Sequence, residues 1–140
     1  MDSEDLNLLA NVNFLLRQDL VARFRRLGFD VTAEEWSVLE TLQGLPGLTV
    51  TDLAQRNHRD KTTTTRMMDR LIGKGLAERR TPEKDRRVQT LFLTRKGYEV
   101  CSDLKSVAAQ VAKDAADGVA PDFTNNLRVM LANLKAQKSK

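Results

Sequence analysis

The sequence is poor in the residues that metal sites and most enzyme active sites use. It contains one cysteine, Cys101, and one histidine, His58. A single cysteine excludes a disulfide within the chain, and so few soft ligands exclude a structural zinc site built by one chain. A Cys–His nucleophile pair would require these two residues to meet, and no second histidine is left to act as a general base. We therefore expect no metal, no cofactor and no enzymatic activity.

The sequence also lacks a long hydrophobic run. No apolar stretch approaches the roughly 20 residues that are needed to cross a bilayer. Residues 1–5 are acidic, whereas a signal peptide begins with a basic segment. We expect a cytoplasmic protein with no membrane partner.

Positive charge is concentrated in the middle of the 140-residue chain, which is the usual length of one compact unit. Residues 56–96 hold thirteen Lys or Arg and five Asp or Glu, a balance of +8, whereas the other 99 residues balance at −4. A local excess of this kind is typical of a surface that meets a polyanion. A solvated charged surface is the alternative interpretation.

Helices are predicted where apolar residues recur at steps of three and four. Thr32 and Glu35 have the spacing of a capping box, and Thr49 begins a similar pattern. Asp60 and Thr94 can each cap the helix that follows them. The expected helices cover residues 5–27, 32 to about 43, 53–56, 61–74, 95–115 and 122–137, and the expected strands cover residues 77–81 and 88–94.

The order of these elements predicts a mainly α fold. A short helix, a tight turn and a second helix form a helix-turn-helix, and the two strands form a hairpin with a charged tip at residues 82–87. The predicted fold is a winged helix-turn-helix of about six helices plus a two-stranded β-hairpin wing, with the terminal helices forming a dimerisation region. In such folds the second helix of the unit enters the major groove of DNA, whose width of about 12 Å admits one helix.

The helix predicted over residues 61–74 has a polar side that fits this role. Thr63, Arg66 and Arg70 follow one another at i, i+3 and i+7, away from the apolar residues. Threonine is a mediocre helix former, so propensity does not explain the run Thr62–Thr65. An exposed polar face without a ligand is the alternative.

Three separated motifs occur in order along the chain: the run from Asp60 to Arg79, the tripeptide Asp85-Arg-Arg87, and Leu93-Thr-Arg-Lys-Gly97. Together they resemble the multiple-antibiotic-resistance regulator (MarR) family of bacterial transcription factors, and the flanking helices extend the resemblance over nearly the whole chain. The resemblance implies one MarR-like chain over residues 1–140. Its DNA-binding lobe would cover residues 32–96, and its dimerisation region residues 5–27 and 95–137. Small effectors would bind between those parts.

The resemblance also implies which residues contact DNA. Arg86 or Arg87 matches the wing arginine that enters the minor groove, where negative potential is concentrated, and Asp85 would orient that arginine. Lys61 and Arg79 stand where phosphates would pass. The full predicted set is Lys61, Thr62, Thr63, Thr65, Arg66, Arg70, Arg79, Asp85, Arg86 and Arg87.

The sequence departs from the family pattern beneath the predicted recognition helix. Asn57 and Arg59 occupy the turn, and Thr64 occupies the inner side of the helix, where apolar residues are frequent. We expect looser or rearranged packing there. Trp36 and Cys101 are interpreted as packed core residues, the alternatives being an effector-stacking ring and a redox-active thiol.

The sequence as a whole predicts a DNA-binding transcriptional regulator that acts as a dimeric repressor and is released by a small effector. Its expected partners are double-stranded DNA, a second copy of the chain and that effector. The alternative is a winged-helix module that contacts protein, or that binds DNA only as architecture.

Overall fold

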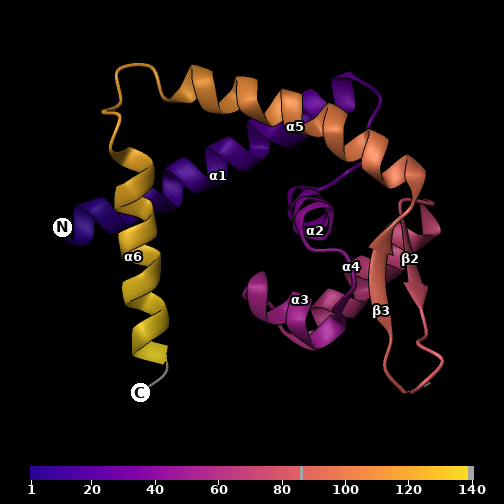
Figure 1. Cartoon of the computed structure of the whole chain (residues 1–140). Coiled ribbons are helices and arrows are strands. Elements are labelled where there is room, and N and C mark those ends of the chain that lie inside the picture. Colours follow the sequence, from indigo (N-terminus) through magenta and orange to yellow (C-terminus); the bar gives the residue numbers. More distant parts are fainter. Residues whose placement is uncertain (86, 139–140) are drawn as a thin grey trace.

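The computed structural model of the chain describes residues 1–85 and 87–138, and within these residues it has six helices and three short strands (Figure 1). Arg86, one of the two candidate wing arginines, lies outside the described residues. The elements are α1 (Ser3–Arg26), α2 (Ala33–Gly44), β1 (Leu48–Thr49), α3 (Val50–Arg56), α4 (Lys61–Gly73), β2 (Ala77–Arg80), β3 (Thr90–Leu93), α5 (Arg95–Ala115) and α6 (Phe123–Lys138).

The helices begin where the sequence provides a capping side chain. Thr32 and Glu35 form the predicted capping box at the start of α2, each side chain accepting a hydrogen bond from the other residue's backbone N–H at 3.1 Å. Asp60 caps α4, and the Thr94 hydroxyl accepts a hydrogen bond from the Gly97 backbone N–H at the start of α5. These local signals confirm the predicted helix starts, because a cap satisfies backbone donors that have no partner within the helix.

The sheet has one strand more than the predicted hairpin. The strand order is β1-β3-β2, and all pairs are antiparallel. Ala77 pairs with Leu93 and Arg80 with Thr90 in the wing, while Leu48 of β1 pairs with Leu91. Because β1 is only two residues long, it shows no alternation that a sequence pattern could reveal.

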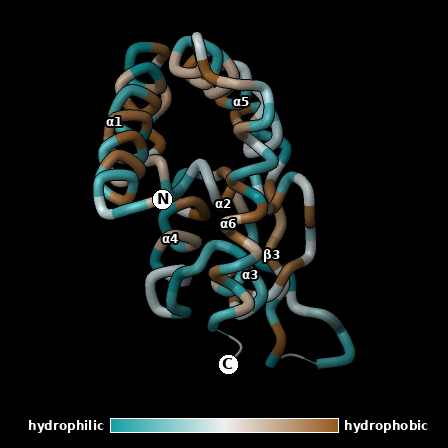
Figure 2. The backbone as a smooth tube through the Cα atoms, turned by 90° about the vertical axis from the view of Figure 1, so that its left-hand side faces the viewer, coloured by the Kyte–Doolittle hydropathy of each residue, from teal (hydrophilic) through white to brown (hydrophobic). Residues whose placement is uncertain are grey.

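One hydrophobic core joins the terminal helices to the middle of the chain. Phe24 of α1, Leu39 of α2, Met68 of α4, Leu91 of β3 and Leu104 of α5 are all fully buried in it. Figure 2 shows α1 and α5 together at one end of the molecule and α3 with the wing at the other. The helices α1 and α5 therefore help to build the lobe that carries α4.

Two segments leave apolar side chains exposed. Helix α6 has no buried residue, and Figure 1 shows it standing apart from α2, α4 and the wing. The amino-terminal half of α1 also has no buried residue, whereas its second half buries Leu20 and Phe24. The exposed apolar residues of the two segments are Leu6, Leu8, Val12, Phe14, Leu15, Phe123, Leu127, Val129, Leu131 and Leu134. No helix in the described part of the chain is long and apolar enough to span a bilayer.

Candidate nucleic-acid interface

Helix α4 has a buried apolar side and an exposed basic side. Thr64, Met67, Met68 and Leu71 are buried, and of these Met67 was not predicted from the spacing. Lys61, Thr62, Arg66 and Arg70 are exposed, and Thr63 and Thr65 are partly exposed. The structure thus brings the predicted polar residues of this helix onto its solvent side.

The threonine hydroxyls are arranged by hydrogen bonds near the start of α4. The Thr63 hydroxyl donates to the Asp60 carboxylate at 2.8 Å, and the Thr65 hydroxyl donates to the Lys61 carbonyl at 2.9 Å. Since those protons are used, both oxygens can offer only lone pairs to an incoming donor. Within residues 1–85 and 87–138, the Thr62 hydroxyl has no hydrogen-bond partner, so it can both donate and accept.

Asp60 organises this end of the helix. Its carboxylate accepts hydrogen bonds from the Thr63 backbone N–H at 2.7 Å and from the Thr63 hydroxyl. These two bonds, together with the charge of Arg66, hold the pKa of Asp60 below its usual range. The cap therefore remains ionised at neutral pH, and it fixes the first turn of α4.

Polar side chains lie beneath α4 and in the turn before it. The Thr64 side chain is fully buried, and its hydroxyl donates to the Asp60 carbonyl at 2.8 Å. In the turn, the Asn57 side-chain oxygen accepts a hydrogen bond from the Thr41 hydroxyl of α2 at 3.1 Å. Hydrogen bonds thus satisfy the Thr64 hydroxyl and the Asn57 side-chain oxygen, whereas the Asn57 side-chain nitrogen is buried without a partner among the described residues.

The wing carries the predicted Asp–Arg pair. The Asp85 carboxylate accepts from the Arg87 backbone N–H at 3.0 Å and from its Nε at 3.3 Å, while the Arg87 side chain is 92% exposed. An arginine held at its base in this way loses less conformational freedom when it enters a groove. Of the two candidate wing arginines, Arg87 has this contact among the described residues.

The Arg79 side chain is held by an ion pair that the sequence did not predict. Its guanidinium forms an ion pair with Asp69 of α4 at 2.5 Å and is only partly exposed. The pair ties strand β2 to the outer side of α4. Arg80, which was not among the predicted residues, stacks on Phe92 at 3.9 Å from the ring centre and pairs with Glu78.

These elements converge on one groove of about 470 Å³. Lys61 and Thr65 line it from α4, Arg79 from β2, and Arg87 from the wing. Residues that the sequence did not single out complete the lining, and they are Thr49, Val50, Thr51, Val88 and Gln89. Four of the predicted residues thus share a single basic groove. Polar side chains near β1 could not be placed there without knowing that β1 pairs with β3.

A second cavity, of about 310 Å³, lies where α1, α2 and α5 meet. Leu16, Leu20 and Val111 make its wall apolar, and Arg17 and Trp36 are at its edge. The Trp36 indole nitrogen is buried and has no hydrogen-bond partner within the described residues. Trp36 therefore packs against the core and also contributes to the lining of this cavity.

Cys101 is a packed thiol. It is buried and lies 3.5 Å from the Gln43 side-chain oxygen. Burial raises the pKa of the Cys101 thiol, with a smaller contribution in the same direction from Glu40, whereas Lys105 opposes it. Because the thiolate is the reactive form, these surroundings make the residue unreactive.

The helix-turn-helix and the three-stranded sheet with its basic wing place the chain in the class of winged helix-turn-helix proteins. Residues 31–88 match the MarR family. A proposed transcriptional regulatory protein for the hcr operon of Thauera aromatica is 24% identical over 139 residues, which cover 95% of this chain and 84% of that protein. Over residues 31–88 the chain is similar to the MarR family of transcriptional regulators.

Solved structures of MarR regulators extend this match beyond the family segment. A cysteine-to-serine variant of MarR from E. coli, bound to operator DNA, is 26% identical, with a TM-score of 0.79 over 91% of each chain. A MarR transcriptional regulator from Methanosarcina mazei Go1 is 24% identical, with a TM-score of 0.86 over 96% of this chain and 99% of that one. The terminal helices are therefore part of the shared fold.

Proposed function

We propose that this chain is a DNA-binding transcriptional regulator that acts as a dimeric repressor. The observation that carries the proposal is the basic groove, in which Lys61 and Thr65 of α4 lie together with Arg79 and Arg87. A helix with a basic outer side and an exposed arginine on a hairpin suit the major and minor grooves respectively. The E. coli structure with operator DNA, which has the same fold, supports this assignment.

Within the proposed interface, residues divide by the part of DNA that they can reach. Arg66 and Thr63 point outward from the middle and start of α4, so we assign them to base edges along with Thr62 and Arg70. Lys61 and Arg79 border the groove and are assigned to phosphates. Phosphate contacts position the protein on the duplex, whereas base contacts select the sequence.

We further propose that the exposed apolar faces of α1 and α6 form the dimer interface. The two segments expose ten large apolar side chains, and apolar surface gathered on exposed helices commonly marks a protein–protein interface. In this arrangement residues 32–96 form the DNA-binding lobe, and residues 5–27 and 95–137 form the dimerisation region. Because α1 and α5 also contribute to the core of the lobe, a change in the dimer would reach α4.

The effector is assigned to the cavity between α1, α2 and α5. Its volume of about 310 Å³ matches a small molecule, and Trp36 is one of the residues that line it. Trp36 is the only tryptophan, so its fluorescence reports binding directly. A shift in Trp36 emission that saturates with a ligand and that is accompanied by release of DNA supports this assignment.

The proposal is tested by selecting duplexes from a random pool with the full chain and measuring affinity at fixed salt. A regulator should bind the selected duplex tighter than a scrambled one by a factor on the order of 10³ or more. A ratio near one would instead favour the architectural alternative. Light scattering on the same sample should give twice 15.8 kDa. An enzymatic activity is not part of the proposal, since the family consists of regulators.

A further inference from the structure

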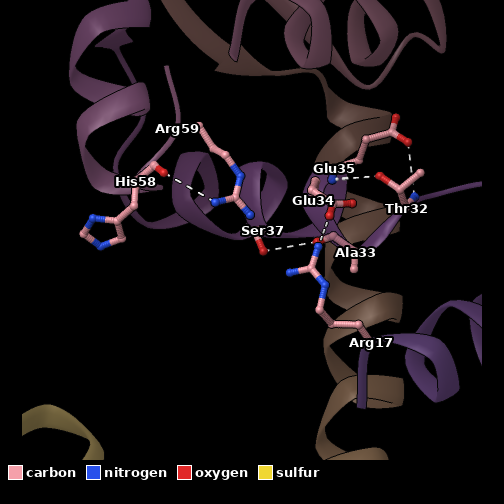
Figure 3. A network of polar contacts seen from close by, with 8 residues as sticks. All are labelled: Arg17, Thr32, Ala33, Glu34, Glu35, Ser37, His58 and Arg59. Atoms are coloured by element: carbon pink, nitrogen blue, oxygen red, sulfur yellow. Dashed lines mark hydrogen bonds and ion pairs between the residues drawn. The ribbon is translucent and has the colours of Figure 1, made fainter. Parts of the chain in front are cut away.

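The first turn of α2 carries two successive carboxylates that reach different parts of the molecule. Glu34 forms an ion pair with Arg17 of α1, whereas Glu35 forms one with Lys74, the residue that caps the carboxyl end of α4. Figure 3 shows Glu34 directed toward Arg17 and Glu35 directed toward Thr32. One helical turn therefore touches both a proposed dimer helix and the proposed reading helix.

Glu35 is a buried carboxylate whose hydrogen bonds are well satisfied. Its side chain is 1% exposed and accepts hydrogen bonds from Lys74 Nζ at 2.9 and 3.1 Å and from the Thr32 backbone N–H at 3.1 Å. Lys74 Nζ also donates to the Asp30 carbonyl at 2.7 Å, so it joins α4 to the loop before α2. A buried charge is tolerated only with such partners, which makes the contact specific in its geometry.

The two ends of α4 are held very differently. The amino-terminal end is capped by Asp60, a residue that lies just before the helix, and it exposes Lys61 and Thr62 to solvent. The carboxyl end is fixed by the Lys74 ion pair, and the next residue, Gly75, accepts a 2.6 Å hydrogen bond from the Thr94 hydroxyl. Apolar packing under α4 is not directional, so the directional contacts at the carboxyl end restrict the tilt of the helix, together with the ion pair between Asp69 and Arg79.

We propose that Lys74 is a positioning residue for DNA recognition, and that it acts through buried Glu35. By fixing the tilt of α4 against α2, the pair aligns Thr63 and Arg66 with base edges. The inference rests on the proposed function, because it takes α4 to be the helix that reads DNA. Hydrogen bonds to bases depend strictly on geometry, so they lose more from a change of tilt than contacts to phosphates do.

The signs of the charges separate this role from general electrostatics. Glu35→Gln removes a negative charge and Lys74→Met removes a positive one. If charge alone mattered, the first change would strengthen binding to any duplex and the second would weaken it. A positioning role predicts instead that each of the two substitutions weakens binding to the selected duplex by about tenfold, because each breaks the same ion pair. The double variant should lose no more than either single one.

The experiment measures fluorescence anisotropy of labelled duplexes with the full chain, using a duplex selected by the wild-type protein and a scrambled version. Lys74→Arg should restore most of the affinity, because it keeps the ion pair. Arg23→Met is the matched control, because it removes one positive charge of similar exposure. Arg23 pairs with Asp19 of the same helix and with Asp114 of α5, and neither partner is on α4. This control should leave the ratio between the two duplexes unchanged.

The outcomes distinguish the inference from the function on which it rests. If Glu35→Gln strengthens binding, or if Lys74→Met weakens both duplexes equally, the positioning role is wrong while the regulator stands. If the wild-type chain selects no sequence, the proposed function fails and the inference fails with it. Thermal unfolding checks that each variant is folded, and should Glu35→Gln not fold, Lys74→Met and Lys74→Arg still decide the question.

Discussion

Helices α4 and α6 both present a side to solvent, but they expose opposite chemistry. Helix α4 buries its apolar residues within its own chain and exposes Lys61, Arg66 and Arg70, whereas α6 buries none and exposes apolar residues such as Leu127 and Leu131. A charged exposed side can remain in water until a polyanion arrives. An apolar exposed side is stable only when another surface covers it. We therefore expect α4 to bind a polyanion and α6 to bind an apolar surface, and substitutions can remove either of these two surfaces without altering the other.

The largest effect is expected from charging the apolar side of α6. Leu127→Glu combined with Leu131→Glu should convert the dimer into a monomer of 15.8 kDa and weaken DNA binding by at least tenfold, because a dimer contacts two half-sites. Light scattering and anisotropy measure the two effects. Asn125→Glu, on the opposite side of α6, is the control and should keep the dimer. A double variant that remains dimeric would mean that α6 is not in the interface.

The wing provides the next largest effect. Arg87→Ala should lower DNA affinity by about tenfold, whereas Lys138→Ala, which removes an equal charge near the carboxyl terminus, should have little effect. The reason is that Arg87 is held by Asp85 at the tip of a projecting hairpin. Equal losses from the two substitutions would show that diffuse charge, and not a placed wing, drives binding.

Arg79 should affect the salt dependence of binding more than its sequence preference. Arg79→Ala should weaken selected and scrambled duplexes alike and reduce the slope of log affinity against log salt by about one unit. Its partner Asp69 competes with phosphate, so Asp69→Asn should release Arg79 and modestly raise affinity for both duplexes. A selective loss on the selected duplex would assign Arg79 to a base instead.

The smallest effect is expected at Cys101. Burial raises the pKa of its thiol above the ordinary value of 9.0, so the native thiol should react slowly with a thiol reagent at pH 8, and mild peroxide should leave DNA affinity unchanged. The folded chain holds this proton to higher pH than the unfolded chain does. Its contribution to stability is thus complete at neutral pH and is lost as pH rises above 9. Rapid labelling would contradict the packed assignment.

Sequence reasoning succeeded where the determining interactions are local. The starts of α2, α4 and α5 follow from Thr32, Asp60 and Thr94, because a cap acts within three or four residues. The glycine that ends the third sequence motif, Gly97, is required by the fold: a Cβ there would lie 2.0 Å from the Leu76 carbonyl oxygen. Only glycine permits this approach of α5 to the backbone of Leu76, just before β2.

It failed where residues distant in the sequence meet. Strand β1 exists only because Leu48 pairs with Leu91, and nothing within two residues signals a strand. The ion pair between Glu35 and Lys74 likewise joins residues 39 positions apart, so the capping role of Glu35 was visible but its second partner was not. Arg79 was assigned to phosphate without its contact to Asp69, for the same reason.

The central claim is that α4 reads base sequence, and substitution of Arg66 tests it most directly. Wild-type chain and Arg66→Ala should be titrated against the selected and the scrambled duplex at several salt concentrations, with Arg26→Ala as an exposed arginine away from α4. Loss of a base contact predicts a cost of about 1 to 3 kcal/mol on the selected duplex, little change on the scrambled one, and no selective loss for the control. Equal weakening of both duplexes by Arg66→Ala would show that α4 meets DNA as charge and not as a reader of sequence.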